Sequence, residues 1–220
     1  LMNLELKKRL ITSIFLLTLL FMMFLYPFIL IISSILIGLI SWIEFYGLVS
    51  KIFKKNDNKS KVLRFLYKSS SLLYLSGLVF FIISAKLINI NLYIVFIYSL
   101  LIAIMSDIGG LLIGKTFKGK KLSKISPNKT LSGSLGSFLF SLILIPFFLK
   151  YFNSYNILTI VMYTVVISLA SQLGDLLISL LKRKAKVKDT SDLLPGHGGV
   201  LDRIDGIIFA IPVGLLIFNI

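Results

Sequence analysis

The chain has 220 residues, 57% of them hydrophobic, with a mean hydropathy of +0.96 and a formal net charge of +15. A soluble domain of this length needs far less apolar surface. We therefore expect an integral membrane protein built from helices, because backbone polar groups in lipid must pair internally. The sequence contains no cysteine and one histidine, which excludes disulfides, thiolate nucleophiles and a multi-histidine metal site within one chain. A metal would be held by oxygen ligands, which favours ions such as Mg²⁺.

Seven apolar runs are long enough to cross a membrane. They cover about residues 10–26, 28–49, 69–86, 90–112, 131–149, 156–181 and 204–220. No small-residue cleavage site follows the first run, so we expect it to remain as a membrane helix. The predicted fold is an all-α, polytopic helix bundle with about seven transmembrane helices. Because the N-terminal helices are apolar all round, a homodimer is also open to the chain.

The positive charges gather in alternate connecting segments. Three Lys/Arg residues lie at 7–9, and six lie in each of the segments 51–64, 115–129 and 182–203. Since Lys and Arg accumulate on the cytoplasmic side, this pattern predicts an N-in, C-out topology in the inner membrane. It interprets the net charge as topology and attraction to membrane lipids, not as nucleic-acid binding.

No internal repeat or low-complexity linker divides the chain. We expect one transmembrane domain over residues 1–220, with N-terminal helices at about 10–86 and a C-terminal half at about 90–220. The charged loops 115–130 and 182–203 of this half would lie on the same cytoplasmic face.

The sixth run places polar residues at helical spacing. Ser171, Asp175, Ser179 and Lys182 follow one another at intervals of four, four and three, so they share one helix face. An acid inside an apolar run costs about 2.5–3.5 kcal/mol on insertion scales. This cost favours a metal or substrate ligand at Asp175 over a polar helix–helix contact, which is the alternative.

Two further acids, Asp202 and Asp205, are expected one turn apart at the start of the last helix. They could cap that helix and match its dipole. Alternatively, Asp202 joins Asp175 as paired carboxylates for a divalent metal in phosphoryl-type chemistry. Asp107 is the other intramembrane acid and a further candidate ligand.

Two loops contain candidate phosphate-binding residues. His197, Gly198 and Gly199 follow Pro195-Gly196, and such glycines let backbone amides approach an anion, although an ordinary turn would look similar. The segment Ser126–Thr130 combines a turn with a helix start, which is a natural phosphate seat. The other lysines of that loop are better explained by topology. Gly109–Thr116 matches the Walker A pattern, but a membrane helix rather than a strand precedes it, so we reject a P-loop.

Residues 179–205 resemble the signature of the phosphatidate cytidylyltransferases, also called CDP-diacylglycerol synthases. Ser126-Pro127-Asn128-Lys129-Thr130 and Ser106–Gly109 resemble the family as well. In place of the Trp-Glu-Gly that often follows the former block, this chain has Leu131-Ser132-Gly133. The signature positions are Ser179, Lys182, Arg183, Lys188, Asp189, Ser191, Pro195, His197, Gly198, Gly199, Asp202, Arg203 and Asp205.

The resemblance implies a nucleotidyltransferase that makes CDP-diacylglycerol and pyrophosphate from CTP and phosphatidic acid, with Mg²⁺ and room for a second ion. Asp175 and Asp202 would be the principal metal ligands, with Asp107 as a further one. The implied catalytic residues also include Lys182, Arg183 and His197. The implied substrate-binding residues are Ser126, Lys129, Thr130, Ser179, Lys188, Gly198, Gly199, Arg203 and Asp205.

Two other functions stay open. A relative that transfers cytidylate to a different lipid phosphate would carry the same signature. A small ion-coupled transporter could explain Asp107 and Asp175, but not the conjunction of the His-Gly-Gly block with Asp202, Arg203 and Asp205.

Overall fold

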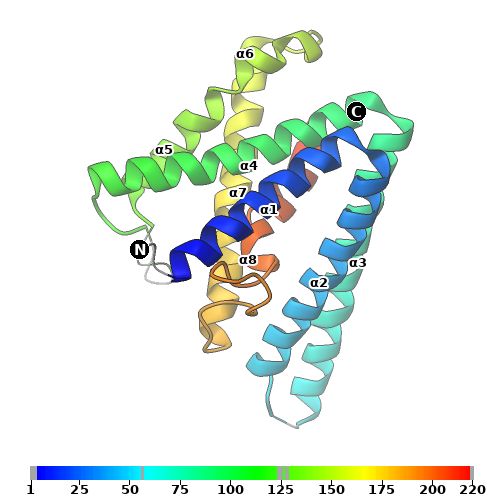
Figure 1. The fold of residues 1–220 in the computed structure, drawn as a ribbon, viewed down its shortest axis with the longest axis vertical. Helices are drawn as coiled ribbons and strands as arrows, with labels where there is room; N and C mark the ends of the chain where they lie inside the picture. The colour runs from blue at the N-terminus through cyan, green and yellow to red at the C-terminus, as the bar shows by residue number, and fades with distance from the viewer. Residues whose placement is uncertain (1–3, 56, 123–125, 127–128, 219–220) are drawn as a thin grey trace. The chain divides into compact units, whose positions relative to one another are not determined.

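A computed structural model describes residues 4–55, 57–122, 126 and 129–218 (Figure 1). Within these residues the regular elements are helical and no named strand occurs, which confirms the all-α prediction. In chain order they are α1 (Leu4–Leu25), α2 (Pro27–Ile52), α3 (Asn58–Ile88), α4 (Ile90–Phe117), α5 (Leu131–Leu142), α6 (Ile145–Phe148), the 3₁₀ helix η1 (Leu149–Tyr151), α7 (Ile157–Lys184), α8 (Leu201–Ile204) and α9 (Ile207–Ile217).

Six helical segments of the described chain are long and apolar enough to cross a membrane, in agreement with a prediction of about seven. They are α1 to α4, α7, and the stretch Leu131–Tyr151 that contains α5, α6 and η1. This last stretch was expected to be one helix, but it breaks before α6. Pro146 explains the break, because proline has no amide hydrogen to donate to the carbonyl four residues earlier and its ring clashes with that carbonyl.

The C-terminal apolar run also differs from the expectation. One helix was predicted from about residue 204, with Asp202 and Asp205 one turn apart on it. This prediction was wrong, because α8 ends at Ile204 and a turn at 205–206 separates it from α9. The Asp205 carboxylate accepts the Gly206 backbone N–H at 2.9 Å, a local bond that competes with helical continuation. The 11 residues of α9 rise only about 16 Å, too short to cross the apolar layer.

The third run was expected over 69–86, but α3 begins at Asn58. The basic residues 59–64 are therefore helical. The N-cap of α4 is clear: the Asn89 side chain accepts the backbone amides of Asn91 and Leu92 at 3.0 and 3.3 Å, so α3 and α4 are separate helices.

The chain divides into two compact units. Unit 1 contains Leu1–Leu87 and Leu181–Ile204, and unit 2 contains Ile88–Leu180 and Asp205–Ile220. The residues of the signature are thus shared between the units, with α7 running from unit 2 into unit 1. The single transmembrane domain that we expected over the whole chain stays a prediction.

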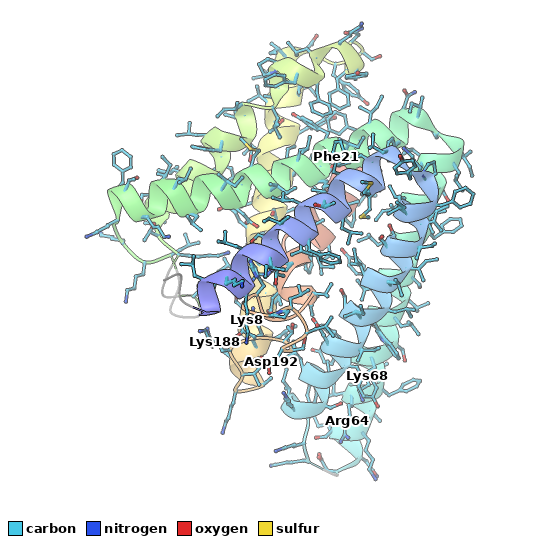
Figure 2. The ribbon with its side chains drawn as sticks, viewed as in Figure 1. Lys8, Phe21, Arg64, Lys68, Lys188 and Asp192 are labelled. Atoms are coloured by element: carbon cyan, nitrogen blue, oxygen red, sulfur yellow. The ribbon has the colours of Figure 1, made fainter. Side chains whose placement is uncertain are left out.

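In unit 1, α2 packs beside α3, and α1 packs against α2 (Figure 1). The Trp42 indole donates to the Lys68 carbonyl at 3.2 Å, and the Lys68 ammonium lies 3.1 Å from the centre of the Tyr46 ring. Figure 2 shows Lys68 one turn along α3 from Arg64. This cation–π contact gives the Lys68 ammonium a partner on the neighbouring helix.

In unit 2, α4 packs closely on α5 through glycines. A Cβ added at Gly109 would lie 2.4 Å from the Gly136 carbonyl oxygen, so only glycine allows this approach. A polar network then ties α7 to both helices: Ser168 donates to Ser106 at 3.1 Å, and Ser134 donates to Gln172 at 2.5 Å. These contacts fix the part of α7 that carries Asp175.

The aromatic core of unit 2 surrounds Tyr98, which is fully buried and bonded to the Thr164 hydroxyl at 2.6 Å. The rings of Phe152 and Phe218 stack at 4.4 Å between centroids and join the same cluster. Aromatic packing of this kind rigidifies the end of the unit away from the candidate site residues on α7.

Candidate active site

The loop between α7 and α8 is built around the Asp202 carboxylate. Asp202 Oδ2 accepts the Thr190 and Gly199 backbone amides at 2.8 and 2.9 Å and lies 3.0 Å from the Thr190 hydroxyl. Its other oxygen pairs with the Lys182 ammonium at 2.6 Å. The side chain of Asp202 is only 4% exposed. One carboxylate therefore holds the two ends of the loop and the end of α7 together within unit 1.

The charge of Asp202 is stabilised by these donors. Burial alone would raise the pKa of Asp202, but hydrogen bonds from Lys182, Thr190 and Gly199 outweigh it and hold the pKa below the ordinary aspartate value. Asp202 is therefore ionised at neutral pH and its ion pair with Lys182 is intact.

A second buried carboxylate supports the same loop from α2. Glu44 is 6% exposed and accepts the Thr190 hydroxyl at 2.8 Å and the Ser191 hydroxyl at 2.6 Å. The backbone amides of Val200 and Leu201 also donate to it, at 3.0 and 2.8 Å. The two amides begin α8, where a carboxylate satisfies otherwise unpaired donors.

Sequence reasoning missed Glu44. The signal was present, since Glu44 is an acid inside the apolar run 28–49, the same observation that identified Asp175 in another run. Its partners lie about 150 positions further along the chain, so no local spacing pointed to them.

Gly199 is required by this packing. A Cβ there would lie 2.0 Å from the Thr190 hydroxyl and 2.5 Å from Glu44 Oε2. Its amide, which we expected to approach an anionic ligand, donates to Asp202. Gly198 adopts the left-handed region at φ 81°, where glycine is favoured, and so permits the sharp turn after His197.

His197 and Arg203 are joined through the backbone. The Arg203 guanidinium donates to the His197 carbonyl through Nε at 3.0 Å and through its terminal nitrogen at 2.5 Å. The ring Nε2 of His197 lies 3.2 Å from the Ser13 hydroxyl of α1. The ring Nδ1 is buried, and no hydrogen-bond partner for it occurs in the described part of the chain.

These residues border a pocket of about 710 Å³ in unit 1. Of the predicted site residues, Lys188, His197, Gly198 and Arg203 line it, together with Asp189 and Asp192 from the same loop and Lys8 and Arg9 from α1. Figure 2 labels Lys8 and Lys188 near the start of α1, with Asp192 close by. The pocket is predominantly basic, which suits an anionic ligand.

In unit 2, Asp175 lies on α7 with partners of a different kind. Its carboxylate forms an ion pair with Lys129 and accepts the Ser179 hydroxyl at 3.2 Å. The contact with Ser179 agrees with the predicted helical spacing of four. Both partners are side chains, and the Asp175 side chain is 23% exposed, so this acid is more accessible than Asp202.

The predicted phosphate seat begins α5. The Thr130 side chain accepts the Gly133 amide at 3.0 Å as an N-cap, and the Ser132 hydroxyl bonds to the Lys118 carbonyl. Lys129 is engaged with Asp175, and Ser126 accepts the Lys129 amide at 3.1 Å. Pro127 and Asn128, which belong to the same predicted block, lie outside the described residues.

The other predicted residues fall at the margins of these groups. Arg183 is exposed at the end of α7 and donates to the Val187 carbonyl at 3.4 Å. Asp107 lies on the exposed face of α4, and Asp205 is buried in unit 2. The Walker-like segment Gly109–Thr116 is entirely helical within α4, as expected from the rejection of a P-loop.

The carboxylates supply the hard oxygen donors that Mg²⁺ prefers. Within the described residues no group of three or more His, Cys, Asp or Glu side chains is close enough to hold a metal. Asp175 and Asp202 lie in different units, and each is paired with a lysine there. Their donor chemistry fits a hard cation, and an ion on either acid would take the place of a lysine ammonium.

Comparison with known proteins identifies relatives of this chain. The model of the family described as "Cytidylyltransferase family" matches residues 3–220. Proteins named phosphatidate cytidylyltransferase are 42% identical in Staphylococcus aureus (strain COL) and 39% identical in Staphylococcus haemolyticus, each over 120 residues. Each alignment covers 53% of this chain and 46% of the relative, so the chain spans about half the length of the curated relatives it matches.

Proposed function

The chain belongs to the cytidylyltransferase family, and we propose that it is a phosphatidate cytidylyltransferase, transferring CMP from CTP to phosphatidic acid. The observation that carries this proposal is the basic pocket of unit 1, bordered by the loop between α7 and α8, whose flanking residues Lys182 and Asp202 form an ion pair. The names of the Staphylococcus relatives support the same activity.

The proposed reaction balances as a single substitution at phosphorus. A phosphate oxygen of phosphatidic acid bonds to the α-phosphorus of CTP, and the bond from that phosphorus to the bridging β-phosphate oxygen breaks. The products are CDP-diacylglycerol and pyrophosphate. A phosphate monoester is already anionic near neutral pH, so the nucleophile needs little help from a general base. The main barrier is repulsion between anions, which a site rich in fixed cations reduces.

The basic side chains have distinct parts in this proposal. Lys188 and Arg203 line the pocket and would bind phosphate oxygens, and Arg183, exposed at the end of α7, would add a further cation for the substrates. Lys182 and Lys129 are each paired with an aspartate, so each would occupy its carboxylate until substrate or a cation takes its place. His197, held through its carbonyl by Arg203, would orient the triphosphate together with Gly198.

We further propose that Asp175 and Asp202 hold Mg²⁺, with Asp107 as a further ligand and with a second ion allowed. Carboxylate and hydroxyl oxygens such as Asp175 and Ser179 are suitable donors. When bound, Mg²⁺ would neutralise phosphate charge and align the reacting groups.

The apolar helices suggest a multi-pass membrane protein. We propose that it lies in the inner membrane, N-in and C-out, with the active site facing the cytoplasm. The distribution of Lys and Arg supports this topology. A homodimer and the absence of nucleic-acid binding stay predictions.

The decisive experiment is transfer of radiolabelled cytidylate into lipid by the purified full chain in mixed micelles. We expect lipid-linked cytidine only when phosphatidic acid and Mg²⁺ are both present. A panel of other lipid phosphates tests the related enzyme that uses a different lipid. The Asp202→Asn variant should transfer cytidylate about 10²–10³-fold more slowly, whereas Lys184→Ala, in an exposed residue outside the pocket, should behave as wild type. Lack of lipid-linked cytidine with every lipid phosphate would refute the proposal.

A further inference from the structure

The pocket of unit 1 has two walls, and only one belongs to the signature. The loop contributes Lys188 and the adjoining helix α8 contributes Arg203, while α1 contributes Lys8 and Arg9. The sequence pattern assigned both α1 residues to membrane topology, which requires only that they lie on the cytoplasmic side. Their position in the lining of a pocket is an additional fact that topology does not explain.

One face of α1 is built to contact the loop. Thr12, which is 6% exposed, has its hydroxyl 3.0 Å from the Pro195 carbonyl, and the Ser13 hydroxyl lies 3.2 Å from His197 Nε2. Lys8 and Thr12 are four residues apart, as are Arg9 and Ser13, so both cations lie one turn before a residue that contacts the loop.

Helix α1 approaches the loop closely at Gly196, so a side chain at this position would force the Arg9 side chain to move. Gly196 has φ 74°, and a Cβ there would lie 2.7 Å from Arg9 Cγ and 3.5 Å from the Arg9 amide nitrogen. The aliphatic stem of Arg9 therefore packs directly on the loop. Arg9 also lines the same pocket as His197 and Arg203.

Within the described residues, the pocket has an excess of positive charge and an unpaired hydrogen-bonding group, and both suit a bound phosphate. Its lining contains four cationic residues and two aspartates, and two of the cations come from α1. In addition, the buried Nδ1 of His197 has no partner in the described part of the chain. If Nε2 accepts from Ser13, Nδ1 carries a proton, and a phosphate oxygen is an acceptor for it.

We propose that Lys8 and Arg9 bind a phosphate group of a substrate in this pocket, with Thr12 and Ser13 holding the loop against α1. The inference rests on the proposed function for the identity of the substrates. The phosphate could belong to the nucleotide or to the lipid, and the experiment separates these sources. Arginine binds phosphate through two parallel N–H donors, so Arg9 is expected to contribute more than Lys8.

The test uses glutamine substitutions, which remove charge but keep the stem that packs on the loop. Lys8→Gln and Arg9→Gln are compared with Lys7→Gln, a matched control one residue away that carries the same topological charge and does not line the pocket. The KM for CTP is measured at saturating phosphatidic acid, and the KM for phosphatidic acid is measured at saturating CTP.

We expect Arg9→Gln to raise one KM roughly tenfold or more, the loss of one charge-assisted hydrogen bond, with Lys7→Gln unchanged. A rise for CTP identifies the nucleotide phosphates, and a rise for phosphatidic acid identifies the lipid phosphate. Arg9→Lys should recover part of the loss. Unchanged KM values for both substrates in the Lys8→Gln/Arg9→Gln double variant, with wild type active, would overturn the inference and leave the proposed function standing.

A binding measurement keeps the inference testable without turnover. Pyrophosphate, CTP and nanodiscs containing phosphatidic acid are titrated into the full chain, and the thermal midpoint or binding heat is recorded. If wild type and Lys7→Gln bind a phosphate probe and the double variant binds it at least tenfold more weakly, the inference is supported even if no cytidine is transferred. Equal binding by all of them, or no binding of any phosphate probe to wild type, refutes it.

Discussion

The two units hold their carboxylates in different ways. In unit 1, Glu44 and Asp202 both accept backbone amides of the loop, which cannot leave without refolding it. In unit 2, Asp175 is paired with the side chains of Lys129 and Ser179, which can rotate away. A carboxylate saturated by backbone donors maintains structure, whereas one balanced by mobile side chains can exchange them for a ligand. We therefore expect Glu44 and Asp202 mainly to stabilise unit 1, and Asp175 to exchange its partners for a ligand more readily.

The largest expected effect separates Asp175 from Asp202. Asp175→Asn should reduce cytidylate transfer by about 10²–10³-fold, the loss expected when a preorganised electrostatic group is removed, with little change in thermal midpoint. Asp202→Asn should reduce transfer similarly and also lower the free energy of unfolding by about 1–3 kcal/mol, because its amide donors lose a carboxylate acceptor.

The measurements are initial rates and thermal unfolding of the detergent-solubilised chain. Asp57→Asn is the control, since Asp57 is exposed before α3 and asparagine caps helices equally well. An Asp175→Asn variant as destabilised as Asp202→Asn would break the contrast between the units.

Glu44 provides the next effect. Glu44→Gln places an NH₂ group among hydroxyl and amide donors, so we expect a loss of about 1–3 kcal/mol in unfolding free energy. Displacement of the loop should also lower transfer by about 10²-fold. Thr190→Val, which removes one hydroxyl shared by Glu44 and Asp202, should have a smaller effect of the same sign, and Thr190→Ser should restore it. Unaltered melting of Glu44→Gln would show that the loop does not depend on α2.

The low pKa of Asp202 predicts how acid weakens unit 1. A group whose pKa is lower in the folded than in the unfolded state stabilises the fold above its ordinary pKa, 3.8 for aspartate, and loses this contribution as pH falls through the folded value. The thermal midpoint should therefore fall between about pH 5 and pH 3, and Asp202→Asn should show a shallower fall over this range. Parallel curves for the two proteins would contradict the assignment.

Much of this arrangement could be predicted from the sequence, because local patterns carry it. Apolar run length predicted the helices, and the spacing of four between Asp175 and Ser179 predicted their contact. The break before Pro146 has a local cause that run length ignores. The rest depends on contacts between distant segments.

Glu44 and Arg9 illustrate what local patterns omit. The partners of Glu44 are known only once α2 lies beside the loop, so its apolar neighbours gave no hint of them. A charge count places Arg9 on one side of the membrane but cannot place it against Gly196. Similarly, the amide of Gly199 was expected to face an anionic ligand, but the anion that it binds is Asp202.

The smallest expected effect lies where α7 ends in unit 1. The Lys186 amide donates to Arg183 and the Val187 amide donates to Lys182, both at 3.0 Å, which forms a Schellman motif with Lys186 at φ 58°. Because this left-handed conformation strains every residue with a Cβ, Lys186→Gly should raise the unfolding free energy by about 1 kcal/mol. Lys184→Gly, at the last residue of α7, should lower it by up to about 1 kcal/mol.

The two glycine variants also test which positive charges bind phosphate and which serve membrane topology alone. Lys184 and Lys186 are exposed and do not line the pocket, so both glycine variants should transfer cytidylate at the wild-type rate once the assay temperature is well below unfolding. A Lys186→Gly variant that is more stable but less active would mean that its ammonium helps to attract the anionic substrates. Basic residues outside the pocket lining would then also act on phosphate. The contrast between carboxylates held by backbone amides and carboxylates paired with side chains would no longer account for all the charged residues, because the end of α7 would have to be included.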